Sequence, residues 1–223
     1  MQYDWNFDIF APYKWALLNG LWVTIQLTIY SSFLGTIIGI PLGALLRFRP
    51  LKIITLPFND IFRAIPLLVL IYLFYYFPYK DFLGIEPLSE FTCALLALTL
   101  AQAVFTADIV RAAVNGVSEK TILGAKSLGF KNKQIWRYVI IPDILRQTLP
   151  TLVAFYIGNL KLSSLASVIA TPDILYVAKT ASGQSFRSLE AWILVAVIYI
   201  ILVLPLSYFA RKLEQSKWLK RRN

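Results

Sequence analysis

Two basic side chains interrupt long apolar stretches of this sequence, and their chemistry suits the recognition of a carboxylate. Arg63 lies within the apolar run 53–77, three residues after Asp60. Lys161 lies within the run 149–170. A charge at membrane depth is expensive and usually faces a partner or a polar cavity. Arg63 either contacts a solute or extends to the cytoplasmic surface. Lys161 faces a solute path, a neighbouring chain or a buried acid, unless it snorkels out of the lipid.

Enzyme catalysis is not expected from this chain. The sequence contains no histidine, which removes the commonest general base and the commonest metal ligand. Its only cysteine, Cys93, lies in an apolar run and cannot form an intramolecular disulfide or a cysteine metal cluster. A Gly-x-x-x-x-Gly-Lys-Ser/Thr sequence is also absent, so the chain cannot hold the phosphates of ATP in a P-loop. We therefore expect no catalytic residue, metal or cofactor in this chain, and an energy source on another polypeptide.

The composition places the chain in a membrane. Of its 223 residues, 58% are hydrophobic and 15% are charged, whereas a soluble domain carries about a quarter charged residues. A transmembrane helix needs about 20 consecutive apolar residues. The sequence predicts an all-α membrane protein that forms a single transmembrane domain over residues 1–223. Its five transmembrane helices are expected at about 18–46, 54–77, 91–111, 149–170 and 190–210.

The basic residues are distributed unevenly between the two sides of this five-helix arrangement. Loops 47–52 and 111–146 and the tail 211–223 carry 16 of the 22 lysine and arginine residues, and four lie in the opposite loops. Because cytoplasmic loops carry the excess of lysine and arginine, the N-terminus is predicted outside and the C-terminus in the cytoplasm. Topology and anionic lipid then explain the formal charge of +10, and a nucleic-acid partner is not expected.

A stripe of small residues recurs at every fourth position of the first predicted helix, at Ser31, Gly35, Gly39 and Gly43. Small residues at this spacing let a second helix approach closely. Chance also produces such stripes in membrane helices, because these tolerate glycine. We expect Gly35, Gly39 and Gly43 to form a packing face.

The segment 108–142 is the one long polar stretch of the chain, and it predicts two short amphipathic helices. Apolar residues recur at intervals of three and four, namely Ile122, Ala125, Leu128, Ile135, Tyr138 and Ile141. Ser118 is the expected N-cap, Gly129 the expected left-handed end of the first helix, and Pro142 the expected break after the second. Two helices joined at a glycine form a surface on which a cytoplasmic partner docks or lipid headgroups pack.

The spacing of this segment resembles the EAA loop of ABC importer permeases. Leu123-Gly124-Ala125, Gly129 and the final Ile141-Pro142 follow the order of that loop, with Leu-Gly-Ala in place of the family's Glu-Ala-Ala. In the family, the loop is a coupling helix that fits a groove on the cytoplasmic ATPase. The resemblance implies a coupling loop at 115–142, between the third and fourth predicted helices. The residues expected to contact or shape the ATPase interface are Ser118, Glu119, Leu123, Gly124, Ala125, Leu128, Gly129 and Pro142.

Two further segments resemble the polar amino-acid branch of this family. The segment 63–69 is similar to Arg-Gly-Thr-Pro-Leu-Leu-Val, and the segment 161–169 is similar to one that begins Lys-Asp-Thr-Ser-Leu. Asp108 and Arg111 also occupy the place of an acidic residue followed three positions later by arginine. The substrate path is expected to include Arg63, Pro66, Lys161, Ser163 and Ser164.

The resemblance runs over nearly the whole chain and implies a permease subunit of an ATP-driven importer of a polar amino acid, in a prokaryotic cell membrane. It implies transport by alternating access, without enzymatic activity in this chain. The implied partners are a cytoplasmic ATPase dimer that binds ATP and Mg²⁺, a second permease subunit, an extracytoplasmic solute-binding protein and membrane lipid. The alternative is a non-transport membrane scaffold or sensor subunit whose basic loop docks a different cytoplasmic partner.

Overall fold

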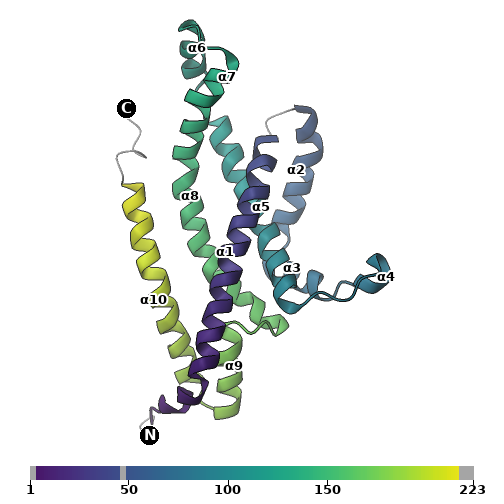
Figure 1. Cartoon of the computed structure of the whole chain (residues 1–223), viewed down its shortest axis with the longest axis vertical. Helices are drawn as coiled ribbons and strands as arrows, with labels where there is room; N and C mark the ends of the chain where they lie inside the picture. The colour runs from purple at the N-terminus through teal and green to yellow at the C-terminus, as the bar shows by residue number, and fades with distance from the viewer. Residues whose placement is uncertain (1–3, 46–48, 216–223) are drawn as a thin grey trace. The chain divides into compact units, whose positions relative to one another are not determined.

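The computed structural model describes residues 4–45 and 49–215, and all regular secondary structure within these two ranges is helical. Figure 1 shows the succession of helices along the chain. The predicted basic loop 47–52 falls partly on residues 46–48, and the end of the basic tail falls on residues 216–223. These parts of the predicted topology lie outside the described residues.

Four helices in the described part of the chain are long and apolar enough to cross a membrane. They contain α1 (Lys14–Leu45), α5 (Glu90–Asn115), α8 (Ile141–Leu162) and α10 (Ser188–Glu214). A fifth span results when α2 (Arg49–Ala64) and α3 (Leu67–Tyr75) are taken together across a sharp bend. The prediction of an all-helical membrane protein is therefore confirmed.

Two of the predicted spans differ from continuous helices. The predicted span 54–77 is interrupted after Ala64, because Pro66 has no amide hydrogen to donate and disfavours a helical backbone in the residue before it. The predicted span 149–170 begins earlier, since α8 already starts at Ile141. Beyond Leu162 the chain continues as the 3-10 helix η3 (Ser163–Ile169).

The chain divides into two compact units. Unit 1 takes the part of α1 up to Ser32, residues 66–99 and residues 157–206. It includes the 3-10 turn η1 (Asp8–Tyr13), α4 (Tyr79–Leu83) and α9 (Ile174–Ser185). Unit 2 takes residues 33–65 and 100–156 and the end of α10 from Ser207, and it contains the polar segment between α5 and α8.

One apolar cluster of unit 1 joins η1 to α9 and α10. Its buried members are Phe10, Ala181 and Ala191, with Ile9, Tyr13 and Leu194 packed against them. Gly20 of α1 lies against the backbone at the start of α9, because a Cβ at Gly20 would come within 2.9 Å of the Asp173 carbonyl oxygen. A side chain at this position would therefore push α1 away from α9.

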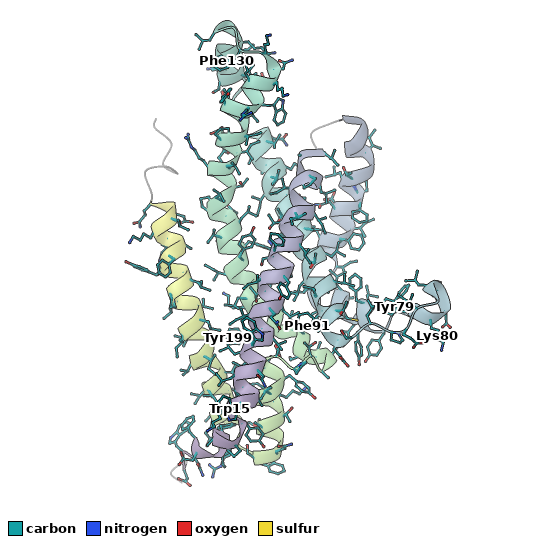
Figure 2. The ribbon with its side chains drawn as sticks, in the orientation of Figure 1. Trp15, Tyr79, Lys80, Phe91, Phe130 and Tyr199 are labelled. Atoms are coloured by element: carbon teal, nitrogen blue, oxygen red, sulfur yellow. The ribbon has the colours of Figure 1, made fainter. Side chains whose placement is uncertain are left out.

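A short arm in unit 1 carries α4. Tyr79 is buried at the base of the arm, and its hydroxyl donates to the carbonyl oxygen of Phe74 at 2.7 Å. Lys80 and Phe82 of the arm are exposed. Figure 2 labels Tyr79 and Lys80 on this arm. Within this arm, which links α3 to α5, the helix α4 ends at Gly84, which has φ +67°.

In unit 2, the small residues of α1 lie against α5. A Cβ placed at Gly39 would lie 2.5 Å from the carbonyl oxygen of Ala103, and one placed at Gly43 would lie 2.5 Å from that of Ala107. No side chain fits at such distances. Gly39 and Gly43 therefore mark the place where these two helices approach most closely, as small residues in membrane helices allow.

Candidate functional site

The segment between α5 and α8 begins with α6 (Glu119–Ser127), which ends in a Schellman motif. The amide of Gly129 donates to the carbonyl of Lys126 at 2.9 Å, and the amide of Phe130 donates to the carbonyl of Ala125 at 3.1 Å. This pair of bonds needs a left-handed residue after the helix, and Gly129 has φ +82°. Figure 2 labels Phe130 at the resulting turn. The predicted role of Gly129 in ending the first helix agrees with this geometry.

A small apolar core holds this loop together from inside. Its buried members are Val117, Ala125, Ile135 and Ile140, with Ile122, Val139 and Ile144 packed against them. Leu128 was expected on the same face but is 79% exposed, because it lies at the C-cap, beyond the last helical residue. Ser118 occupies the N-cap position with an extended backbone, although its side chain makes no capping hydrogen bond.

The second predicted helix does not end at Pro142. Instead, α7 (Asn132–Ile135) passes through a π-helical turn (Trp136–Ile140) directly into α8, whose second residue is Pro142. A proline ring normally presses on the carbonyl four residues earlier in a helix. In a π turn the hydrogen bonds span five residues, so the widened backbone accommodates the ring. The prediction of a break at Pro142 is therefore wrong.

The π turn also changes which side chains face the core of the loop. Ile135 and Ile140 are five residues apart and are both buried. Tyr138 and Ile141, which the spacing of three and four residues placed on the inner face, are both exposed. Apolar residues five positions apart do not fit the period of an α-helix. The sequence therefore did not predict that Ile135 and Ile140 share the inner face.

The outer face of α6 exposes apolar side chains. Leu123 is 60% exposed, and a Cβ placed at Gly124 would meet no atom within 4 Å. Leu128, just beyond the end of α6, is also an exposed apolar residue of this outer surface, and Glu119 is exposed in the first turn. Exposed leucines on an otherwise polar loop are available to a docking protein. Ala125 faces the core of the loop instead and supports this surface from beneath.

A polar cluster in unit 2 centres on Asp108 of α5. Its carboxylate accepts hydrogen bonds from Arg63 of α2 and from Arg111 of α5, each at 2.8 Å, and from Asn59 of α2 at 3.2 Å. The Asp108 side chain is only 16% exposed. Hydrogen bonds between ionised groups are stronger than neutral ones, especially where water is partly excluded. Asp108 therefore joins α2 to α5, in addition to pairing with Arg111 within α5.

The contact between Arg63 and Asp108 was not predicted from the sequence, which assigned Arg63 to a substrate path or to the cytoplasmic surface. The available signal was the presence of opposite charges in two predicted spans. One guanidinium nitrogen of Arg63 binds Asp108, while 51% of the side chain stays exposed. Arg63 thus has a structural partner and still presents donors to its surroundings.

In unit 1, Asn159 joins α8 to the middle of α1. Its amide nitrogen donates to the hydroxyl oxygens of Ser31 and Ser32, at 2.8 and 3.0 Å, and all three side chains are buried. Four residues further along α8, Ser163 lies 3.5 Å from the hydroxyl of Thr28. Because α1 has 32 residues, these contacts fall near its midpoint. The sequence offered no prediction for Asn159; the available signal was an asparagine within an apolar run, which does not identify its partner helix.

Lys161 lies between these two contacts, at the level of the middle of α1. It is exposed, it occupies the last turn of α8, and no ion pair between described residues includes it. The hydroxyl of Ser163 is buried and donates to the carbonyl of Leu160 at 2.8 Å. The hydroxyl of Ser164 donates to the carbonyl of Lys161 at 2.7 Å.

The predicted path residues therefore differ in what they offer a solute. In unit 1, Lys161 is exposed in the last turn of α8, and Pro66 is exposed at the start of α3. Both serine hydroxyls bind the backbone at the end of α8. Arg63 belongs to unit 2.

A buried acid that sequence reasoning missed stands at the start of α9, outside the spanning helices. Asp173 is the N-cap residue, and its Oδ1 accepts from the amide of Tyr176 at 2.8 Å. The side chain is fully buried, and this burial raises the pKa of Asp173 to about 7, against the lowering effect of nearby amides. Within the described residues no group of acidic or cysteine side chains is arranged to hold a metal ion.

Comparison with known proteins agrees with this architecture. A family model described as the inner membrane component of binding-protein-dependent transport systems matches residues 35–218. The octopine transport system permease protein of Rhizobium radiobacter is 35% identical over 217 residues, which cover 93% of this chain and 88% of that protein. The glutamine transport system permease protein of Escherichia coli K12 is 29% identical over 217 residues, which cover 96% of this chain and 98% of that protein.

Solved structures of ABC transporters share the fold. An amino acid ABC transporter crystallised with histidines contains a chain that is 28% identical, with a TM-score of 0.86 over 96% of this chain and 99% of that one. A chain of the methionine ABC transporter in an inward-facing conformation has the same fold, with a TM-score of 0.77 over 94% of this chain and 99% of that one, at 23% identity. The family match spans most of the sequence, from the middle of α1 to beyond α10, and the chain belongs to the inner membrane components of binding-protein-dependent transport systems.

Proposed function

We propose that this chain is the permease subunit of an ATP-driven ABC importer that moves a polar amino acid, or a close analogue, into the cytoplasm. The observation that carries the proposal is the loop 115–142. Within this loop, α6 is capped at Gly129 and is supported by the apolar core of the loop, and Leu123 and Leu128 are exposed. The chain has no P-loop, so the protein that docks on this surface must supply the ATPase activity.

In this proposal, a cytoplasmic ATPase dimer binds ATP and Mg²⁺ and holds α6 in a surface groove. Closure of the dimer moves α6, and α7 and α8 move with it because helical structure continues from Asn132 to Leu162. The family's glutamate is replaced by Leu123, so the contact at this position is apolar rather than an ion pair. ATP shifts the permease between its inward-open and outward-open conformations only if the ATPase dimer binds one of these conformations more tightly.

An amino acid is the proposed solute, and relatives named for the transport of glutamine and arginine support this class. A zwitterion needs one cationic and one electronegative partner. The ammonium group of Lys161 suits the carboxylate. The hydroxyl oxygen of Ser164, whose proton is donated to the carbonyl of Lys161, can accept from the ammonium group of the solute.

The complex itself provides the first test. Affinity purification of this chain from its native membrane, followed by mass spectrometry, should recover an ATPase subunit, and a second permease subunit if the two are not identical. Liposomes containing the purified complex, with ATP enclosed and the binding protein outside, should take up a labelled amino acid. Recovery of a different cytoplasmic protein, without an ATPase, would favour a scaffold or sensor subunit.

The role of Lys161 is tested by Lys161→Met, which preserves the length of the side chain and removes its charge. We expect uptake to fall by about tenfold or more, as for the loss of one charged contact to the solute, with the subunits still copurifying. Lys80→Met is the matched control, because Lys80 is exposed on the α4 arm and should leave uptake unchanged. Loss of assembly in Lys161→Met would instead assign Lys161 to subunit packing, and unchanged uptake would exclude both roles.

A further inference from the structure

The turn between α9 and α10 holds a bulky residue in a left-handed backbone conformation. Phe186, the C-cap residue of α9, has φ +57° and ψ 20°. Among the described residues, Ala170 is the other non-glycine residue with positive φ. This conformation is unfavourable for a bulky side chain, and residues held in it are concentrated at functional sites. Packing of the Phe186 side chain does not offset this conformational free energy, because the residue is 90% exposed.

The backbone around Phe186 is fixed by several hydrogen bonds. The amide of Phe186 donates to the carbonyl of Ser182 at 2.9 Å, and the amide of Arg187 donates to the hydroxyl of Ser185 at 3.3 Å. The Arg187 guanidinium donates to the carbonyl of Asp4 at 2.5 Å and pairs with the buried Glu190 at 3.3 Å. The turn therefore presents the Phe186 ring outward on a fixed support.

A second aromatic group belongs to the same end of unit 1. Trp5 and Phe7, which precede η1, stack with their ring centroids 6.0 Å apart and are about half exposed. The bond from Arg187 to Asp4 ties this N-terminal segment to the α9–α10 turn. Figure 1 shows the start of the described chain beside the C-terminal end of α9 and the start of α10.

The α9 side of the Phe186 turn has the composition of a protein interface, whereas the start of α10 exposes Leu189 and Trp192. The inner face of α9 is buried in unit 1, whereas its outer face exposes Lys179, Thr180, Gly183 and Gln184. A helix that faces acyl chains presents apolar side chains outward. An exposed aromatic ring rimmed by polar residues is instead the usual composition of a binding hot spot.

We propose that Phe186, supported by Trp5 and Phe7, is the anchor on which the extracytoplasmic binding protein docks. This inference rests on the proposed importer function and on the orientation that places α9 outside the membrane. The family depends on a binding protein for transport, and that protein must deliver its solute on this side. Docking covers the exposed ring, which accounts for a strained and unpacked aromatic residue at a rigid turn.

The test uses the complete importer in lipid nanodiscs, titrated with the solute-loaded binding protein of the same transport system. Phe186→Gly removes the ring and relieves the backbone strain, so the turn should keep its shape. We expect the binding-protein concentration for half-maximal ATPase stimulation to rise by about tenfold or more, as for the loss of a hot-spot residue. The basal ATPase rate and the melting temperature should not fall. Phe186→Tyr, which retains a ring, should restore docking.

Phe82→Gly is the control, because Phe82 is also a largely exposed aromatic residue, at 73% against 90% for Phe186, and its loss from the α4 arm should not change the titration. An unchanged half-maximal concentration in Phe186→Gly would overturn the docking role. A loss of basal ATPase activity in the absence of binding protein would also overturn it, since that result indicates a lipid anchor or a folding role. If the binding protein fails to stimulate even the parent complex, the importer function itself is wrong, and the docking surface with it.

Discussion

Replacement of Gly129 by valine should uncouple ATP hydrolysis from transport through a change in backbone conformation alone. A Cβ at Gly129 would meet no atom within 4 Å, so the substitution causes no steric clash with other residues. The cost arises from φ +82°, which is unfavourable by roughly 1–2 kcal/mol for a residue with a Cβ and more for a β-branched one. This energy lowers the population of the capped turn by about fivefold to thirtyfold relative to uncapped alternatives.

The loss of the cap should move α6 out of register, because the bonds from Gly129 to Lys126 and from Phe130 to Ala125 both depend on that turn. Uptake and ATP hydrolysis are measured on the same reconstituted complex. We expect amino-acid uptake per ATP hydrolysed to fall by about tenfold, in line with the lowered population of the turn. Gly129→Asn should retain most of the coupling, since asparagine tolerates the left-handed region.

The matched control for Gly129→Val is Gly84→Val. Gly84 ends α4 with φ +67° and also has no atom within 4 Å of a built Cβ. It therefore carries the same backbone strain in the α4 arm, far in sequence from the coupling loop. Equal losses of uptake in both variants would show that strain acts by destabilising the whole chain. Normal coupling in Gly129→Val would refute the assignment of the loop to the ATPase contact.

Three further predictions concern the polar residues and the topology. The pair Asp108→Asn and Arg63→Gln should be non-additive in thermal unfolding, with only a small coupling because half of the Arg63 side chain is exposed to solvent; strict additivity would contradict the ion pair. Asp173 has a folded-state pKa of about 7 against an ordinary 3.8, so its burial should cost stability as pH rises from 4 to 7, by up to roughly 4 kcal/mol. Asp173→Asn should flatten the dependence of melting temperature on pH in this window, and an unchanged slope would show that Asp173 does not cause it. A reporter active only in the cytoplasm should be active when fused after Asn223 and silent when fused after Phe82, whereas the reverse pattern would overturn the predicted orientation.

Features that depend on neighbouring residues were predictable from the sequence. Long apolar runs predicted the spanning helices, because the length and the apolar composition of a segment are enough to identify a helix that can cross a membrane. Gly129 was predicted to end α6 because a left-handed cap is a local requirement that glycine meets without strain. Asp108 and Arg111 were singled out by the family resemblance, and their ion pair within one helix is what a spacing of three residues allows.

Features that depend on distant parts of the chain were not predictable. The bonds from Arg63 to Asp108 and from Asn159 to Ser31 each join two helices, and a single sequence does not show which helices are neighbours. The burial of Asp173 has the same origin, because the backbone beside it is covered by Gly20 of α1. The outward position of Leu128 depended on the residue at which α6 ends, and helix boundaries are uncertain by one or two residues.

The interruption after α2 also explains how Arg63 is tolerated within a predicted span. Lys161 lies where α8 continues into η3 without a break, whereas Arg63 occupies the last turn of α2, which ends inside a segment that the sequence presented as one apolar run. The last four carbonyls of a helix lack donors within it, and together they carry about half a negative charge. A cation in this place is stabilised by typically 0.3–1 kcal/mol, whereas a cation in the middle of a continuous helix gains nothing comparable. Arg63 has the carboxylate of Asp108 in addition. Lys161 has no such acid among the described residues, and helical structure continues past Leu162 as η3, so its exposed side chain is available to an anionic group.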